Sequence, residues 1–210
     1  CFNFINNRFC YCYFIYYILI MKKHSLWVEK YRPTVLDTYL GNDDFIAGVK
    51  EWIEKNDFPN LLLYGTAGVG KTTVAKLLTV NLDCDFIYIN CSDENGIDTI
   101  REKIKTYASA ASFQPIKIVV LDEADFLTIN AQAALRNVIE TFSLNTRFIF
   151  TCNYIERIIE PLQSRLALYR LETPSKPQIY KHVINILDQE NISYIKEDVA
   201  KYKINFFIYS

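Results

Sequence analysis

Apolar residues along the chain follow two alternating patterns. Short continuous apolar runs occupy residues 60–64, 86–89, 116–121, 147–151 and 167–169. Between them, segments 72–82, 97–111 and 131–141 place apolar residues three or four positions apart. Continuous apolar runs are typical of strands buried on both faces, and the three-to-four spacing is typical of helices. The alternation predicts an α/β fold with a five-stranded parallel sheet flanked by helices.

A further helical pattern begins after the Pro-containing segment 173–177. Ser175 is suited to cap a helix, and Pro177 is suited to its first turn. We therefore expect one domain over residues 21–173 and the start of a small helical domain over residues 174–210. The apolar stripe of this last helix comprises Tyr180, Val183, Ile184, Ile186 and Leu187.

The first twenty residues differ from the rest. They contain 8 of the 31 aromatic residues, and no charge lies between Phe9 and Met21. This run is shorter than the roughly 20 residues of a spanning helix, and no small-residue cleavage site follows it. We expect residues 1–20 to be an extension outside the functional protein, not translated in nature, with Met21 as the start. A short membrane anchor and a genuine N-terminal strand are the alternatives.

Composition narrows the class of protein. The chain carries 23 Lys and Arg against 24 Asp and Glu, a net charge of −1, which excludes a polybasic nucleic-acid-binding protein and an acidic disordered one. A local basic patch remains compatible with that total. Cys84, Cys91 and Cys152 lack the spacing of zinc ligands, so we expect free thiols in a reducing, cytoplasmic compartment.

One segment between a predicted strand and a predicted helix carries clear chemistry. Residues 65–72 fit the pattern G-x-x-x-x-G-K-[ST] of a phosphate-binding loop. Its glycines let backbone N–H groups face phosphates at the positive end of the following helix. Lys71 is suited to the β- and γ-phosphates of ATP, and Thr72 to Mg²⁺. We expect the nucleotide to be bound by Gly65, Thr66, Ala67, Gly68, Val69, Gly70, Lys71, Thr72 and Thr73.

Two further strands end in polar residues at the same edge. Asp122 and Glu123 follow the third strand, as in a Walker B motif. We expect Asp122 to hold Mg²⁺ together with Thr72, and Glu123 to orient and deprotonate the attacking water. Asn153 ends the fourth strand, where it is placed to hold that water or the γ-phosphate.

The motifs together resemble one family. Residues 27–33 are similar to the W-x-E-K-Y-R-P box of clamp loader ATPase subunits, and residues 91–97 to their second-strand box. Residues 122–125 resemble their Walker B motif, and residues 163–165 their S-R-C motif. The family comprises the replication factor C small subunits within the AAA+ ATPases. The run 108–113 looks more like the phage-type sliding-clamp-loader large subunits.

The resemblance implies roles for particular residues. The fold would be an AAA+ P-loop NTPase followed by the start of a helical lid, and Asn153 would be sensor 1. Arg165 would be an arginine finger that acts in trans on ATP bound by the neighbouring subunit. The adenine pocket would be lined by Val28, Tyr31, Arg32, Pro33 and Leu40.

The function implied by the resemblance is clamp loading in DNA replication. An ATPase subunit of this kind uses ATP and Mg²⁺ to open a sliding clamp and close it on primer–template DNA. Its partners would be the other subunits of the ring, the clamp and the DNA phosphate backbone, with no membrane. The location would be the cytoplasm, a host cytoplasm for a viral protein or a nucleus for a eukaryotic one. Arg101 and Lys103 are candidates for DNA contacts, with a solvated helix face as the alternative.

The sequence departs from the family pattern at three places. Asn95 stands where cellular relatives usually have Arg, and Leu166 replaces the Cys of S-R-C. We expect residues 174–210 to be a truncated lid without sensor 2, and the collar domain to be absent. Such a chain would bind ATP and Mg²⁺ and, without its neighbours, hydrolyse ATP slowly. The alternatives are a non-hydrolysing nucleotide-binding assembly subunit and another AAA+ DNA motor.

Overall fold

The computed structural model describes residues 27–93, 97–194 and 199. It divides into two units, Cys1–Arg32 and Pro33–Ser210. In the first unit, helix α2 (Trp27–Lys30) places the Trp27 and Tyr31 rings edge to face, with centroids 6.4 Å apart. The expected extension 1–20, Asn95 of the second-strand box and the last eleven residues lie outside the described residues.

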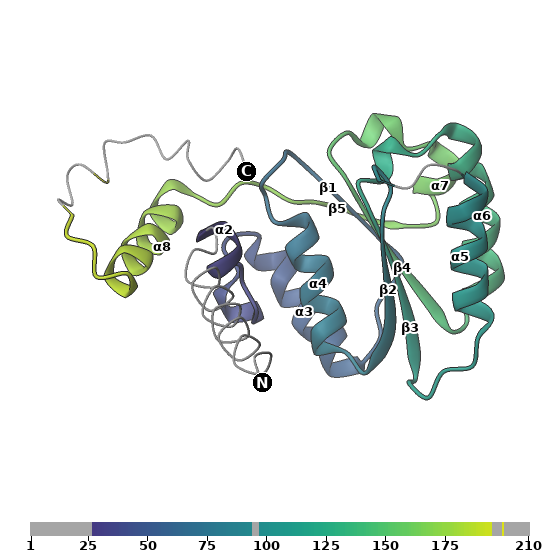
Figure 1. Cartoon of the computed structure of the whole chain (residues 1–210), viewed down its shortest axis with the longest axis horizontal. Coiled ribbons are helices and arrows are strands. Elements are labelled where there is room, and N and C mark those ends of the chain that lie inside the picture. Colours follow the sequence, from purple (N-terminus) through teal and green to yellow (C-terminus); the bar gives the residue numbers. More distant parts are fainter. Residues whose placement is uncertain (1–26, 94–96, 195–198, 200–210) are drawn as a thin grey trace, which may run out of the picture. The chain divides into compact units, whose positions relative to one another are not determined.

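The second unit is built on one five-stranded sheet, in which all strands are parallel and ordered β2-β3-β4-β1-β5 (Figure 1). This confirms the predicted sheet. All seven residues of the interior strand β3 are buried, whereas both edge strands leave alternate residues more exposed. The strands are β1 (Leu61–Tyr64), β2 (Cys84–Asn90), β3 (Ile116–Asp122), β4 (Thr146–Cys152) and β5 (Ala167–Arg170).

Helices cover both faces of the sheet (Figure 1). Successive side chains of a strand point to opposite faces, so Ile118 and Val120 pack on one side and Val119 and Leu121 on the other. The first side carries α3 (Asp43–Lys55) and α4 (Lys71–Asn81). The second side carries α5 (Ile97–Ser109), α6 (Ile129–Phe142) and α7 (Glu160–Gln163).

Helix α3 is an element that the sequence pattern did not predict. It buries Phe45, Ile46 and Val49 in the core beside α4. Its N-cap residue Asn42 has a left-handed backbone (φ 55°) and its side chain makes no capping hydrogen bond, so the usual start signal is missing. Gly48 in its middle also weakens the helical pattern.

The last described helix is α8 (Lys176–Gln189), which begins where the sequence predicted. The Ser175 backbone N–H donates to Gln178 Oε1 at 2.9 Å, and Pro177 lies in the first turn. Of the apolar stripe expected on α8, only Ile186 is buried, and the other members are partly exposed. A helix with a partly exposed apolar stripe is consistent with the start of a lid.

Short 3₁₀ helices shape loops of the described residues: η1 (Leu36–Thr38), η2 (Ala124–Phe126) and η3 (Ile155–Arg157). The buried side chain of Gln132 on α6 joins the segments around η2 and η3. Its Nε2 donates to the Leu127 and Arg157 carbonyl oxygens at 3.1 and 2.9 Å, and its Oε1 accepts from the Ile159 N–H at 2.8 Å. Gln132 therefore links the segments that follow β3 and β4.

Candidate nucleotide-binding site

The loop between β1 and α4 requires glycine at two tightly packed positions. Gly65 and Gly70 have φ angles of 149° and 89°, which side-chain-bearing residues rarely adopt. A Cβ on Gly65 would overlap the Leu171 carbonyl oxygen, and one on Gly70 would lie 2.9 Å from the Tyr39 ring. The glycine spacing read from the sequence is therefore a steric requirement of this loop.

Tyr39 supports the loop from outside the predicted motifs. Its hydroxyl donates to the Val69 carbonyl oxygen at 2.9 Å, and burial raises the pKa of Tyr39 to about 12, which keeps the hydroxyl a neutral donor. Three residues on, Asn42 exchanges hydrogen bonds with the backbone of Glu172 at 2.8 and 3.1 Å. Leu40 thus lies in a segment that is anchored to the loop on one side and to the backbone that follows β5 on the other.

The ammonium group of Lys71 is buried at the centre of the site. It donates to the carbonyl oxygens of Gly65 and Thr66 at 2.9 and 2.8 Å, and to Asn153 Oδ1 at 2.7 Å. Burial lowers the pKa of Lys71 from its ordinary value, and nearby carboxylates such as Asp125 oppose that shift. The bond to Asn153 brings the end of β4 to the loop.

The carboxylate of Asp122, at the end of β3, collects three hydroxyl groups. Thr72 Oγ1 lies 2.9 and 3.0 Å from its two oxygens, and the hydroxyls of Thr151 and Tyr88 also donate to it. Mg²⁺ prefers oxygen ligands and is usually held by one or two carboxylates together with phosphate. The Asp122 and Thr72 oxygens are the chemical type that this cation requires, so the pair fits the expected metal. Among the described residues, no group of three or more His, Cys, Asp or Glu is arranged to hold a metal ion.

Glu123 follows Asp122 in a left-handed backbone conformation, with φ 56°. Its N–H donates to Thr151 Oγ1 at 3.0 Å, which fixes the turn that leaves β3. Positive φ at a residue other than glycine is strained and is concentrated at functional sites. The half-buried Glu123 side chain thereby starts from the same edge of the sheet as the loop.

Asp125, the last acid of the Walker B segment, is buried behind the site. Its Oδ2 accepts the Asn153 N–H at 3.4 Å, and its Oδ1 has no hydrogen-bond partner within the described part of the chain. Beside it, burial raises the pKa of the Cys152 thiol to about 12, so this thiol stays protonated. As expected, Cys91 and Cys152 are buried cysteines outside any disulfide, and Cys84 is a partly buried one.

Arg165 lies in a different environment from the loop. Its Nε donates to Glu140 Oε1 on α6 at 2.6 Å, and its Nη1 donates to the Pro161 carbonyl oxygen on α7 at 2.6 Å. The side chain is 29% exposed. These contacts belong to the face covered by α6 and α7, opposite the face that carries α4.

The remaining predicted residues fall into two groups. Val28, Tyr31 and Arg32 belong to the first unit, and Pro33 belongs to the second, so the adenine pocket stays a prediction. Arg101 on α5 is exposed, as is Lys103, which suits either solvent or a phosphate contact. By contrast, the residues brought together at one edge of the sheet are Gly65, Lys71, Thr72, Asp122, Glu123 and Asn153.

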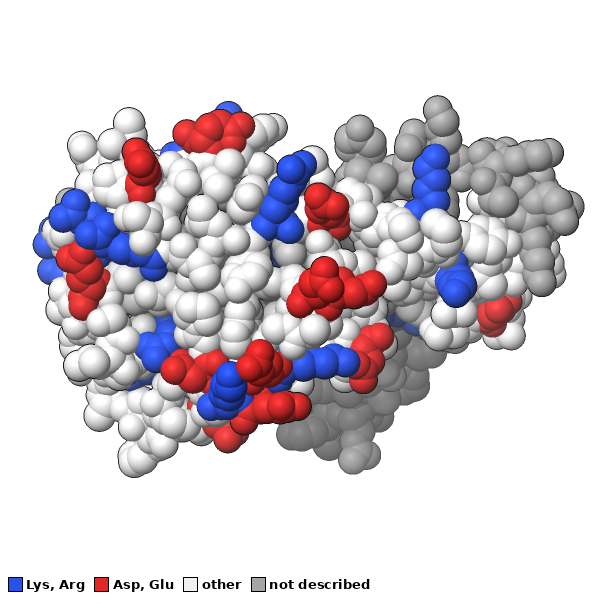
Figure 2. Space-filling model, turned by 180° about the vertical axis from the view of Figure 1, so that it is seen from behind, with Lys and Arg blue, Asp and Glu red and all other residues white. Residues whose placement is uncertain are grey.

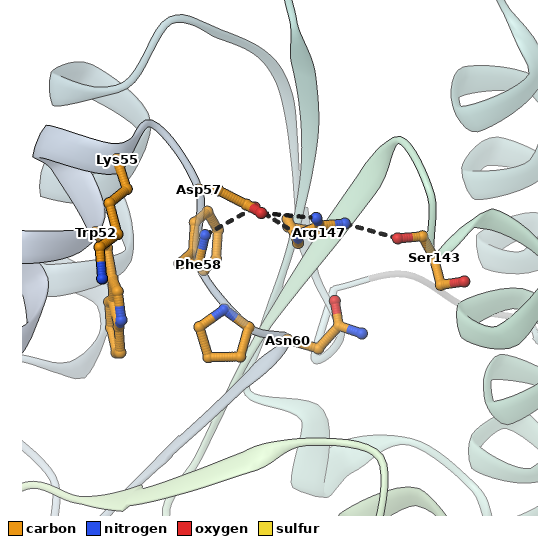
Figure 3. Close-up of a pocket in the computed structure, with 8 residues that line it drawn as sticks. Trp52, Lys55, Asp57, Phe58, Asn60, Ser143 and Arg147 are labelled. Atoms are coloured by element: carbon orange, nitrogen blue, oxygen red, sulfur yellow. Dashed lines mark hydrogen bonds and ion pairs between the residues drawn. The ribbon is translucent and has the colours of Figure 1, made fainter.

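A pocket of about 420 Å³ lies at the opposite edge of the sheet, where β1 and β4 begin (Figure 3). Across it, Arg147 forms a two-pronged ion pair with Asp57 at 2.8 and 3.0 Å and also donates to the Ser143 carbonyl oxygen at 2.7 Å. Because the charges of Arg147 and Asp57 already pair with each other, we assign this pocket a structural role and not a ligand-binding one. Its lining comprises Trp52, Lys55, Asp57, Phe58, Pro59, Asn60, Ser143 and Arg147.

Charges of both signs are interspersed on the face seen in Figure 2, with uncharged surface between them. That distribution agrees with the near-zero net charge of the sequence. In the part of the chain that the structure describes, no helix is both long enough and apolar enough to cross a membrane.

A parallel sheet with a glycine-rich loop before α4 and an acidic strand end beside it defines a P-loop nucleotide-binding domain. Residues 61–171, just over half of the chain, match the family described as ATPase family associated with various cellular activities (AAA). The chain belongs to this family of ATPases. The predicted fold class is confirmed.

Several curated relatives share one more specific description, replication factor C small subunit. The protein of that description from Archaeoglobus fulgidus is 44% identical over 185 residues, which is 85% of this chain and 58% of the relative. Another, from Natronomonas pharaonis, is 42% identical over 181 residues, which is 83% of this chain and 56% of the relative. The resemblance inferred from the motifs is confirmed. The chain spans less than two thirds of the length of these relatives.

Among solved structures, the chain is similar to the Thermotoga maritima RuvB Holliday junction branch migration motor. The TM-score is 0.67, with 15% sequence identity over 80% of this chain and 58% of that one. A single-residue variant of the same motor also matches, with a TM-score of 0.67 and 15% identity. At this identity the likeness concerns the fold alone.

Proposed function

We propose that the chain is the nucleotide-binding part of an ATPase subunit of a sliding-clamp loader. The observation that carries the nucleotide site is the convergence of Lys71, Thr72, Asp122 and Asn153 at one edge of the sheet, within hydrogen-bonding distance of one another in pairs. The clamp-loader role rests on the relatives described as replication factor C small subunit.

In this proposal, the loop N–H groups and Lys71 bind the phosphates of ATP. The Lys71 ammonium exchanges its carbonyl partners for phosphate oxygens, which carry a full charge and accept stronger hydrogen bonds. Thr72 and Asp122 hold Mg²⁺, which neutralises charge on the β- and γ-phosphates when it is bound.

Hydrolysis needs a water that is oriented and deprotonated. Glu123 takes its proton, and the side chain of Asn153, already held at Lys71, positions the water or the γ-phosphate. The left-handed backbone at Glu123 follows directly after β3, at the same end of the sheet as the loop. Arg165 acts on the nucleotide of a neighbouring subunit, since its contacts lie on the face covered by α6 and α7.

The base and the DNA are bound elsewhere. Within the second unit, we assign Leu40 and Pro33 to the adenine pocket. Tyr39 supports this assignment for Leu40, because it fixes that segment against the loop. A ring of such subunits would open a clamp and grip primer–template DNA by its phosphates, so binding should weaken with salt and ignore base sequence.

The test of the nucleotide site is the variant Lys71→Ala. Removing an ammonium that contacts phosphate should weaken ATP binding by about 10- to 100-fold, because a hydrogen bond to a charged group contributes about 1.5–3 kcal/mol. Binding of a fluorescent ATP analogue to the purified chain, with Mg²⁺ present, measures the change.

Lys50→Ala is the matched control. Lys50 is an exposed lysine on α3 whose ion pair with Asp37 measures 2.7 Å, and such surface pairs contribute little. Its loss should leave ATP affinity unchanged. Equal affinities of the Lys71→Ala and wild-type chains would refute the proposed site.

A further inference from the structure

Tyr88 is an aromatic residue on the edge strand β2 that no motif explains. The register pairs Tyr88 with Val120 and Asn90 with Asp122. Since alternate side chains of a strand share a face, Tyr88 lies on the same face as Asp122, the face that carries α4. From there its hydroxyl donates to Asp122 Oδ2.

Three hydroxyl groups donate to the carboxylate of Asp122. An ionised carboxylate offers about four acceptor positions, two on each oxygen. Thr72 Oγ1 lies within 3.0 Å of both oxygens, Thr151 donates to Oδ1 and Tyr88 donates to Oδ2. Each oxygen is therefore close to two hydroxyl oxygens, but Thr72 has only one hydrogen to share between them, so the carboxylate keeps acceptor capacity for a cation.

These hydroxyls have different chemical uses. Thr72 donates its hydroxyl hydrogen to Asp122, and the lone pairs of Thr72 Oγ1 remain available to a cation. Tyr88 and Thr151 approach Asp122 from β2 and β4, the strands on either side of β3. Thr151 donates to Oδ1 and Tyr88 donates to Oδ2, so the carboxylate cannot rotate without breaking one of these two hydrogen bonds.

A cation on α4 steadies the Tyr88 ring. Lys76 Nζ lies 5.5 Å from the ring centroid, within the range of a cation–π contact. Tyr88 is 40% exposed, so contacts of this kind, more than burial, hold its ring in place. The arrangement joins α4, β2 and β3 through one side chain.

We infer that Tyr88 is a positioning residue that sets the Mg²⁺ affinity of the nucleotide site by orienting Asp122. This inference rests on the proposed nucleotide site. In this role Tyr88 acts through the Asp122 carboxylate, to which its hydroxyl donates. Loss of its hydroxyl should let the carboxylate rotate and so weaken the hold on the cation, while the phosphate contacts of Lys71 and the loop persist.

The experiment compares Tyr88→Phe with wild type in the full chain. A fluorescent ATP analogue is titrated in Mg²⁺ and in EDTA, and Mg²⁺ is then titrated into the protein with the analogue bound. We expect the half-saturating Mg²⁺ concentration to rise about 3- to 10-fold, as for partial loss of a hydrogen bond to a charged group. Affinity in EDTA should not change. Thermal unfolding verifies that the variant is folded.

Tyr169→Phe is the matched control, because the Tyr169 ring lies on β5 against Phe45 and Trp52. It should leave both affinities as in wild type. An unchanged Mg²⁺ titration for Tyr88→Phe, or an equal loss of analogue affinity in Mg²⁺ and in EDTA, would overturn the inference about Tyr88. Neither result would contradict the proposed nucleotide site. Failure of the wild-type chain to bind the analogue in Mg²⁺ would overturn both.

Discussion

Lys71 carries its charge into the interior, where an unpaired ammonium is costly. Three oxygen acceptors, two from its own loop and one from Asn153, compensate that cost. The contact with Asn153 spans 82 positions of sequence, so the end of β4 is part of the site. The lysine of the phosphate-binding loop is thus held to the end of a distant strand.

The role of Glu123 is testable by removing only its charge. Glu123→Gln should retain ATP binding and lower hydrolysis by about 10²- to 10⁴-fold, because an amide cannot take a proton from water. Phosphate release by the protein assembled with its neighbouring subunits measures the rate.

Glu102→Gln, an exposed position on α5, is the control for loss of one negative charge. It should hydrolyse ATP at the wild-type rate. Hydrolysis by Glu123→Gln within a few-fold of wild type would remove Glu123 from the mechanism.

Among the elements, β1 and β4 are joined at the edge remote from the nucleotide site. Arg147, the second residue of β4, reaches Asp57 before β1 and the Ser143 carbonyl oxygen after α6 (Figure 3). The hydrogen bond from Arg147 is the main reason that the pKa of Asp57 lies below its ordinary value of 3.8. Burial opposes this shift, and Asp57 remains 52% exposed.

This ion pair predicts a pH-dependent contribution to stability. A carboxyl whose pKa is lower in the folded state stabilises the fold above its unfolded pKa, and the contribution is lost as pH falls through the folded value. Asp57→Asn should therefore lower the free energy of unfolding at pH 7 by about 0.5–1 kcal/mol, discounted for exposure. The difference in unfolding free energy between Asp57→Asn and wild type should shrink as the pH falls below 3.8, the ordinary pKa of Asp57.

Urea unfolding at neutral and acidic pH measures this difference. Glu51→Gln serves as the comparison, because it breaks only the exposed pair with Lys55 on α3. A gap between Asp57→Asn and wild type that stays constant down to acid pH would show that the Asp57 charge is not its source.

At the scale of the whole molecule, the proposed ring would let Arg165 of one subunit complete the ATP-hydrolysis site of its neighbour. Arg165→Ala should leave the variant's own ATP binding intact and abolish hydrolysis at its neighbour's site. Arginine fingers are typically worth about 10³–10⁵ in rate. In subunits mixed with a wild-type partner, site-specific hydrolysis locates the defect.

Arg157→Ala is the control, since Arg157 is an exposed arginine that packs 4.6 Å from the Tyr154 ring. It should not reduce hydrolysis. If mixed assemblies lose activity only at the site of the Arg165→Ala subunit itself, the arginine acts in cis.

The phosphate-binding loop and the strands could be predicted from the sequence because they depend on residues close together along the chain. The spacing of Gly65 and Gly70 follows from backbone angles and close contacts within one loop, and the strand patterns follow from burial on both faces. Helix α3 was missed because its start lacks a capping side chain and Gly48 interrupts it. Tyr39 was missed because its partner, Val69, is 30 positions away.

By itself, the sequence determined the parallel sheet, the phosphate-binding loop and the acids that end β3, since periodicity and contiguous motifs encode them. Only the tertiary structure decided the strand order β2-β3-β4-β1-β5. That order places β2 and β4 on either side of β3, so Tyr88 and Thr151 meet at Asp122. Such contacts depend on how distant segments pack, and no spacing along the chain specifies them.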